Sequence, residues 1–417
     1  MTLTAVTNSA KGYDVQLIVY YILLVVIGWF AIYASAYDKN AASDIFTLHK
    51  PFGRQLIWIG VSFLEILVLL LIDNKLIYSY AHYFYGFCLL IMVIALFIAP
   101  EISGARAWIR IGAFSMQPVE FMKLATALSL AKFFSDSKTK RQRQNIWLYA
   151  SLFIGVAIIL TILQHDTGSA LVFLSFIILF YREGLSTNFL IVGIIVTFIF
   201  IFTLLFNEIY TIGALLTVFL IFWYFQRKDK RKLLRNLYIL IASVIFVFAV
   251  NLFYNNVFQI HQKQRIDSIM GKSSDPKGAD FNLNQSLIAI GSGGFMGKGF
   301  QHSTQMQLNF VPEQSTDFIF CGIAETFGFA GCLTLFAIFM LLIIRIIVLS
   351  EKQRNPFVHY YGYAIAGLFF FHFAINIGMT IGILPIIGIP LPFISYGGTS
   401  ILAFTAMLFI FIKLNNN

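Results

Sequence analysis

Runs of about 16 to 25 apolar residues recur along nearly the whole chain, and this feature limits what it can fold into. Each run is long enough to cross a hydrocarbon core of about 30 Å as a helix, and too long and uninterrupted for a barrel strand. Hydrophobic residues make up 59% of the 417 residues, charged residues only 12%, and the mean hydropathy is +0.81. The sequence therefore predicts an all-α, polytopic membrane bundle and excludes an ordinary water-soluble domain.

Hydropathy predicts twelve spans. The division between the seventh and eighth rests only on Asn207 and Glu208, which interrupt one apolar run. The predicted spans are residues 15–35, 55–72, 77–99, 118–134, 146–164, 168–182, 188–207, 210–226, 235–255, 317–347, 358–382 and 398–413.

The chain carries 29 Lys and Arg against 19 Asp and Glu, an excess that could indicate nucleic acid or membrane topology. The densest basic runs, residues 138–143 and 227–235, lie between apolar segments, where the positive-inside rule places them in the cytoplasm. No aromatic or shape-reading motif accompanies them, so a nucleic-acid partner is not expected. This topology puts both chain ends in the cytoplasm, and no cleavage site follows the first span, which should remain as a helix.

Three cysteines, Cys88, Cys321 and Cys332, all fall in apolar segments. Their spacing matches neither a CxxC pair nor a zinc site, so no disulfide or metal framework is expected.

Glycine, proline and polar residues gather in three segments that the topology places outside: residues 100–117, 256–316 and 385–398. The second is a large extracytoplasmic loop of about 60 residues, too long for a simple turn, and its apolar content argues against disorder. These segments are where the sequence predicts function.

Five groups of motifs along the chain resemble the SEDS (shape, elongation, division and sporulation) family, and the resemblance runs from the first span to the last. The final group is closer to the rod-shape branch of that family than to the division branch. The motifs are GARAWI with QPVEFMK (104–109, 117–123), QHDTGSA (164–170), QSLIAIGSGG with GKG (285–294, 297–299), VPEQSTDFIF (311–320) and NIGMTIGILPIIGIPLPFISYGG (376–398).

The resemblance implies a peptidoglycan glycosyltransferase in the cytoplasmic (inner) membrane that polymerises lipid II at the outer face. It also implies a class B penicillin-binding protein as crosslinking partner, together with other membrane proteins of the elongation complex. The family is usually described with ten helices, so residues 186–235 are expected to hold an extra helical hairpin within one transmembrane domain. The chain departs from the family pattern at Ala107, His165 and Ser315, which leaves a role for the neighbouring Arg106 open.

Polymerisation joins a sugar 4-hydroxyl to an anomeric carbon and expels undecaprenyl pyrophosphate, so it needs a base for the hydroxyl and cations for the pyrophosphate. Because a pyrophosphate leaves as a stabilised anion, one carboxylate suffices. Asp317 lies at the start of a predicted span, where residue type alone favours a helix-capping role. The resemblance implies that Asp317 is instead the catalytic base.

Glu313 precedes Asp317 by four residues and could contact the acceptor sugar, or could be a solvated loop acid. A divalent cation, Mg or Mn, could accompany the pyrophosphate, with Asp317 and Glu313 as possible ligands. The metal remains open.

Lys123 lies in the second turn after Pro118, and a cation there must face a cavity or pair with an acid. It could contact the pyrophosphate, with Arg106 and Arg110 as supports, or form a structural ion pair with Glu120, three residues earlier.

Three further residues are candidate substrate contacts with structural alternatives of their own. Asp166 could instead bond to neighbouring loops, and Glu325, which falls inside a span, could form a buried pairing. The glycines around Lys298 lack the GKS or GKT ending of a P-loop, so close loop packing is expected, with Lys298 near substrate.

Two other functions fit the same composition. A lipid II flippase would also need intramembrane charges, and a scaffold would only anchor the synthase partner. A transporter should show polar motifs near the midplane and repeated halves, which the sequence lacks.

Overall fold

The computed structural model describes residues 12–36, 49–101, 104–112, 114–137, 146–256, 263, 279–300, 303, 305, 310 and 312–416. These residues are helical almost throughout, as expected, and form two compact units, residues 1–183 with 282–417, and residues 184–281. The predicted polytopic helical membrane fold is confirmed.

The helices of the first unit begin at residues suited to starting a helix. Asp14 and Asp73 accept backbone N–H bonds at 3.0 Å from Leu17 and Lys75, and Pro occupies the first position of three other helices. The helices are α1 (Val15–Ser35), α2 (Pro51–Leu71), α3 (Asn74–Ile98), α4 (Pro118–Asp136), α6 (Ile146–Leu163), α7 (Thr167–Val172), η1 (Phe173–Phe176), α8 (Ile177–Arg182), α14 (Ile319–Lys352), α15 (Pro356–Thr380) and α16 (Gly398–Asn415).

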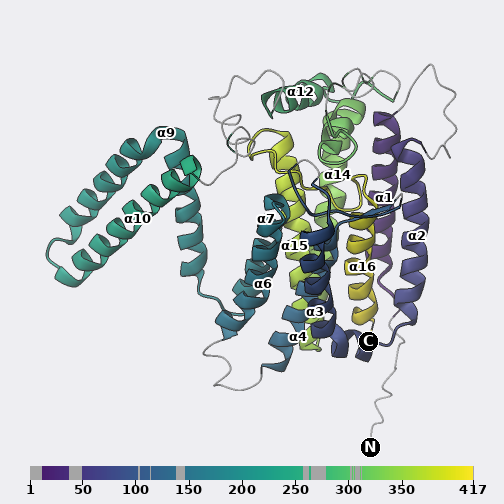
Figure 1. Cartoon of the computed structure of the whole chain (residues 1–417), viewed down its shortest axis with the longest axis horizontal. Coiled ribbons are helices and arrows are strands. Elements are labelled where there is room, and N and C mark those ends of the chain that lie inside the picture. Colours follow the sequence, from purple (N-terminus) through teal and green to yellow (C-terminus); the bar gives the residue numbers. More distant parts are fainter. Residues whose placement is uncertain are drawn as a thin grey trace, which may run out of the picture. The chain divides into compact units, whose positions relative to one another are not determined.

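The core of this unit is formed by α4, α15 and α16, whose side chains are mostly buried. Helix α15 packs against both α4 and α14, and α1 packs against α14. Figure 1 shows α14, α15 and α16 running alongside one another. The connection between α14 and α15 therefore lies at one end of the bundle, and the connection between α15 and α16 lies at the other end.

Ten helical stretches among the described residues are long and apolar enough to cross a membrane. They correspond to ten of the twelve predicted spans. Helix α4 is not among them because it carries Glu120, Lys123, Lys132 and Asp136. The predicted span at 168–182 is a shorter helical run, Thr167–Arg182, that includes the 3-10 turn η1.

The second unit contains α9 (Thr187–Gln226) and α10 (Lys230–Asn256), which pack against each other. Helix α9 runs through the predicted division at residues 207–210 as one element of 40 residues. Its two parts, Thr187–Phe206 and Glu208–Gln226, correspond to the two predicted spans, and each is long and apolar enough to cross a membrane. Glu208 does not mark a turn. It accepts a hydrogen bond from Asn251 Nδ2 of α10 at 2.6 Å, so the polar interruption is satisfied between two helices. Whether residues 186–235 are an insertion stays a prediction.

The segments predicted to lie outside contain short regular elements. Strands β1 (Ile109–Ile111) and β2 (Phe114–Met116) form an antiparallel hairpin in which Arg110 lies opposite Ser115. The predicted loop 256–316 includes a helix, α12 (Ala279–Ser292). Buried Leu283 and Ala289 of α12 pack against Phe318 and Cys321 at the start of α14, so α12 covers that end of the bundle (Figure 1).

Candidate functional site

Asp317 lies in a turn, residues 312–318, that leads directly into α14. The N-cap of α14 is Phe318, which makes no side-chain cap bond, so Asp317 precedes the capping position. The helix-capping interpretation therefore does not match the backbone here. The side chain is half-buried.

Asn376, in the last turns of α15, holds the backbone of Asp317 in place. Its Nδ2 donates to the Asp317 carbonyl at 2.9 Å and to the Ile389 carbonyl at 2.7 Å, and the side chain is fully buried. A Cβ on Gly388 would lie only 3.2 Å from Asp317 Oδ2. Residue 388 therefore sits against the carboxylate, and Asn376 ties both segments to one helix.

A second set of bonds joins the segment before α16 to the residues just before Asp317. Ser395 Oγ donates to the Thr316 carbonyl at 2.6 Å and accepts from Leu391 N at 2.8 Å. Tyr396 N donates to the Ser315 carbonyl at 2.8 Å. The two segments predicted to lie outside thus meet around Asp317.

Glu313 is exposed and adopts a left-handed backbone conformation, φ 50°. Its carbonyl accepts N–H bonds from Thr316 and Phe318, both at 3.2 Å, and Thr316 Oγ1 lies 3.1 Å from its Oε2. These contacts shape the turn that carries Asp317. Within the described residues no group of three or more His, Cys, Asp or Glu side chains comes together, so a metal held by Asp317 and Glu313 stays a prediction.

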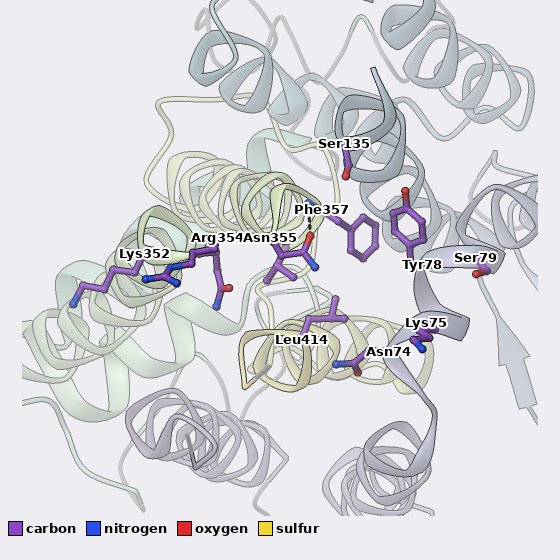
Figure 2. A pocket seen from close by; sticks show the side chains of 12 residues that line it. Asn74, Lys75, Tyr78, Ser79, Ser135, Lys352, Arg354, Asn355, Phe357 and Leu414 are labelled. Atoms are coloured by element: carbon purple, nitrogen blue, oxygen red, sulfur yellow. Dashed lines mark hydrogen bonds between the residues drawn. The ribbon is translucent and has the colours of Figure 1, made fainter. Parts of the chain in front are cut away.

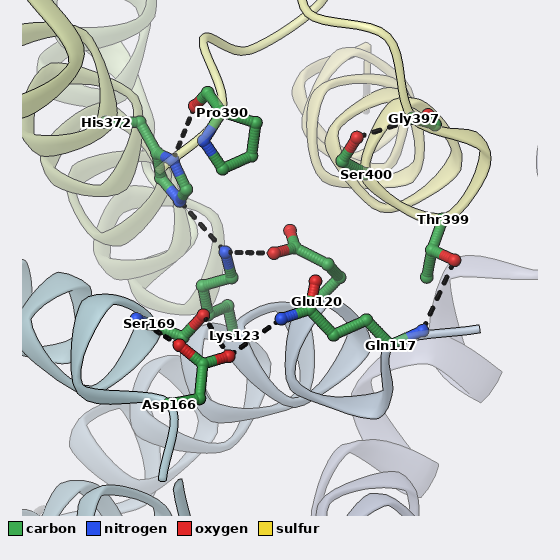
Figure 3. A network of polar contacts seen from close by, with 10 residues as sticks. All are labelled: Gln117, Glu120, Lys123, Asp166, Ser169, His372, Pro390, Gly397, Thr399 and Ser400. Atoms are coloured by element: carbon green, nitrogen blue, oxygen red, sulfur yellow. Dashed lines mark hydrogen bonds and ion pairs between the residues drawn. The ribbon is translucent and has the colours of Figure 1, made fainter. Parts of the chain in front are cut away.

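Lys123 is fully buried, and Figure 3 shows its ammonium group between Glu120 and His372. Its Nζ lies 2.8 Å from Glu120 Oε1, 3.0 Å from His372 Nε2 and 5.5 Å from the ring centroid of Phe404. His372 Nδ1 lies 3.0 Å from the Pro390 carbonyl, which can only accept, so Nδ1 carries the proton and Nε2 accepts from Lys123. The structural ion pair is formed, and the predicted substrate contact of Lys123 and Glu120 remains a prediction.

Asp166 caps α7 and also reaches a neighbouring segment (Figure 3). Its Oδ1 accepts from Ser169 N at 3.0 Å, and its Oδ2 accepts from Ser169 Oγ at 2.9 Å and from Gln117 Nε2 at 2.7 Å. Both oxygens are therefore occupied by neighbouring chain, which is the structural alternative that the sequence left open.

Arg106 and Arg110 are exposed, on the segment between α3 and α4. Arg106 pairs with Glu101 at 3.4 Å, and its backbone N–H donates to the Gln164 carbonyl at 2.9 Å. Such an exposed pair adds little stability, so the guanidinium can exchange partners readily. Thr399 of α16 bonds to the Ser115 carbonyl at 3.3 Å, which brings the same segment to the end of the bundle where Asp317 lies.

Glu325 is fully buried in α14 and pairs with Lys298 at 3.0 Å, while its Oε1 also accepts from Gln305 N at 3.0 Å. Three residues further on, α14 is interrupted at Gly328, where φ is 65° and ψ −163°. The glycine loop fills this break: Phe329 N donates to the Gly294 carbonyl at 2.9 Å. The close loop packing predicted for the glycine motif is thus observed. The ion pair between Lys298 of the loop and Glu325 of α14 also joins the loop to the helix.

His372 contacts Lys123 of α4, and Asn376 bonds to the turn before α14. Sequence reasoning did not single out Ser395 or Gln117, although both lie within quoted motifs. Their role depends on contacts with residues 316 and 166, which no local pattern reveals.

Known proteins share this sequence pattern and this fold. The family model for cell cycle proteins of the FtsW, RodA and SpoVE type matches residues 15–223 and 215–417. The chain belongs to this family. The expected SEDS membership is therefore confirmed, and its RodA-like character is supported by the relatives and solved structures that follow.

Among the family relatives, the peptidoglycan glycosyltransferase MrdB of Escherichia coli is 29% identical over 367 residues, covering 88% of this chain and 85% of its own. The peptidoglycan glycosyltransferase RodA of Treponema pallidum is 28% identical, and the similarity covers 96% of this chain and 96% of that protein. A solved structure concerned with "structural coordination of polymerization and crosslinking by a peptidoglycan synthase complex" is 25% identical, with TM-score 0.66, and covers 97% of this chain and 98% of that one. RodA of Thermus thermophilus shares the fold at TM-score 0.62 and 24% identity, with 97% of both chains covered.

Proposed function

We propose that this protein is a peptidoglycan glycosyltransferase that polymerises lipid II at the outer face of the cytoplasmic membrane, for cell elongation and rod shape. The observation that carries the proposal is the position of Asp317: a half-buried carboxylate at one end of the bundle, with its backbone anchored by Asn376 and with residue 388 against its Oδ2. Relatives named peptidoglycan glycosyltransferases support the same activity.

In this proposal the Asp317 carboxylate removes the proton from the 4-hydroxyl of the acceptor sugar. The hydroxyl oxygen attacks the anomeric carbon of the donor, the bond to the pyrophosphate oxygen breaks, and the configuration inverts. Undecaprenyl pyrophosphate leaves with its electron pair and needs no proton. A fixed backbone on both sides of Asp317 keeps the carboxylate within reach of the hydroxyl, which general-base catalysis requires.

Exposed Arg106 and Arg110 support charge neutralisation of the pyrophosphate, because each can approach an anion without leaving a buried partner unpaired. A divalent cation would supply further neutralisation. Asp317 and Glu313 are carboxylates of the type that holds such ions, and the remaining ligands would come from the phosphates.

A class B penicillin-binding protein is the proposed partner, because the polymer must be crosslinked after it is made. The support is the similarity to a chain from a synthase complex described as joining polymerisation and crosslinking. Other membrane proteins of the elongation complex belong to the same proposal, and so does the cytoplasmic location of both chain ends.

Polymerisation of lipid II by the purified protein, alone and with its partner, tests the proposal. Asp317→Asn should lower the rate by about 10²- to 10⁴-fold, because it removes the base without changing side-chain shape. Asp73→Asn is the matched control: it makes the same chemical change at a helix N-cap, where Asn serves as well as Asp.

If Asp317→Asn polymerises at the wild-type rate while its melting temperature and partner binding are unchanged, the base is another residue. If the wild-type protein never polymerises but moves fluorescent lipid II across vesicle membranes, the flippase is the correct function. A protein that does neither, yet increases polymerisation by its partner, would be a scaffold.

A further inference from the structure

A cavity of about 1150 Å³ opens at the end of the bundle opposite Asp317. Its lining comes from the start of α3, the end of α14, the start of α15 and the end of α16. Figure 2 shows Lys75 and Tyr78 on one side of this cavity and Lys352 and Arg354 on the other. Because α14 begins two residues after Asp317 and ends at Lys352, the whole length of that helix separates the two places.

The charge of the lining has one sign. Lys75, Lys352 and Arg354 are among the twelve lining residues, none of which is acidic. Within the described part of the chain, none of these three cations forms an ion pair. Three cations around one cavity with no neutralising partner make a site for an anion.

The acids nearest in sequence are already engaged. Asp73 accepts the N-cap bond of α3, the Tyr78 hydroxyl donates to Asp136, and Glu351 pairs with Arg182 at 2.8 Å. The excess of basic groups among the lining residues favours an anion from outside this chain.

The position and the volume of the cavity indicate which kind of anion fits it. The lining residues lie at the ends of membrane-spanning helices, the depth at which phospholipid headgroups lie. At about 30 Å³ per molecule, the cavity has room for tens of waters, and so for a phosphorylated headgroup. Amide side chains of Asn74, Gln353 and Asn355 add hydrogen-bonding groups for a phosphate or a glycerol hydroxyl.

We propose that this cavity binds the headgroup of an anionic phospholipid, with Lys75 on one side of the headgroup and Lys352 and Arg354 at the opposite rim of the cavity (Figure 2). The site is independent of the proposed polymerase activity and lies on the other side of the bundle from Asp317. A bound lipid would join the start of α3 to the turn between α14 and α15, which are held together there partly by the contact of Tyr78 with Phe357, ring centroids 5.1 Å apart.

Native mass spectrometry of the full chain in a non-ionic detergent tests the site. An equimolar mixture of dioleoyl-phosphatidylglycerol and dioleoyl-phosphatidylcholine is added, and the retained molecules of each are counted. The wild type should retain phosphatidylglycerol about tenfold or more over phosphatidylcholine, since each basic group near a headgroup adds to the attraction. The triple variant Lys75→Gln, Lys352→Gln, Arg354→Gln should lose that preference.

The matched control is Lys228→Gln, Lys230→Gln, Arg231→Gln, which removes the same charges from the turn between α9 and α10 and should keep the preference. Exposed Arg354→Gln alone should lower it partially, which covers the case in which the triple variant fails to fold. Equal losses in both triple variants would reduce the effect to net charge and overturn the proposal. Absence of a wild-type preference would overturn it too, as would an acidic peptide, such as a short poly-glutamate, displacing the lipid at equal concentration.

Discussion

Lys123 carries an ammonium group into the interior of the bundle, where Glu120 and His372 surround it. Removing one member of a buried pair strands the other charge, so Lys123→Met should lower the free energy of unfolding by about 3 to 5 kcal/mol. Adding Glu120→Leu should restore most of this loss. Thermal unfolding in detergent measures both variants, and a single variant as stable as the wild type would contradict the prediction.

The same pair of variants separates the two roles of Lys123. If the double variant is stable and polymerises lipid II, the lysine is structural. If it is stable and inactive while Asp73→Asn is active, Lys123 contacts the substrate or its pyrophosphate.

Asn376 is the residue whose loss should disturb Asp317 without touching its carboxylate. Asn376→Ala removes two donors and leaves the carbonyls of Asp317 and Ile389 unpaired, at about 1 to 3 kcal/mol each. We expect a lower kcat with little change in KM, because the base is displaced while substrate contacts remain. Thr334→Ala is the control, since its exposed hydroxyl bonds only within α14. An unchanged kcat would show that Asp317 does not need this anchor.

Residue types and spacing identified the candidate residues of the site, but not their partners. Lys123 and Glu120 are three residues apart on one helix, so their pairing was readable. His372 completes the cluster from 249 residues away, and no pattern in a single sequence encodes that distance. The same holds for Asp166 and Gln117, whose bond depends on how two loops pack.

At the scale of elements, the glycine loop and α14 touch through their backbones. A Cβ on Gly293 would lie 2.0 Å from the Ala324 carbonyl, whereas one on Gly291, two residues earlier, would meet nothing within 4 Å. Gly293→Ala should therefore cost about 1 to 3 kcal/mol, and Gly291→Ala, within α12, should be neutral or stabilising by up to about 1 kcal/mol. Denaturation midpoints compare the two. Equal midpoints would mean that the loop moves aside without cost.

Helices with a cap and a long apolar run were predictable, whereas the break inside α14 and the continuity of α9 were not. The interruption at Gly328 depends on the loop bonding that replaces the helical bonds. In α9 the sequence shows Asn207 and Glu208 as an interruption, whereas in the structure the helix continues and Glu208 accepts a hydrogen bond from Asn251 of α10. Tertiary contacts decided both cases.

For the molecule as a whole, the distribution of basic residues predicts which side each end occupies. Green fluorescent protein fused after Asn417 should fluoresce, and alkaline phosphatase inserted between residues 270 and 271 should be active, because its disulfides form only outside the cytoplasm. Inactive phosphatase with a dark fluorescent fusion would reverse the topology. The segments joined around Asp317 would then face the cytoplasm, where the proposed reaction could not occur.

Hydropathy was a good guide to the whole molecule because it reports the solvent, which is lipid. It also located α4 at residues 118–134, but it did not show that this helix lies buried at the centre. The buried side chains of α4 face other helices, so their polarity follows their partners and not the bilayer.

The burial of α4 has a consequence for biosynthesis. The ribosome completes α4 long before His372 exists: at 5 to 20 residues per second the 249 intervening residues take about 12 to 50 s. A charged residue at a helix centre costs about 2.5 to 3.5 kcal/mol during insertion, so α4 alone should enter the bilayer poorly when its membrane integration is measured by glycosylation mapping. The nascent chain must then keep this helix at the insertion machinery or the membrane surface until α15 emerges, and the centre of the bundle would be among the last parts to be assembled.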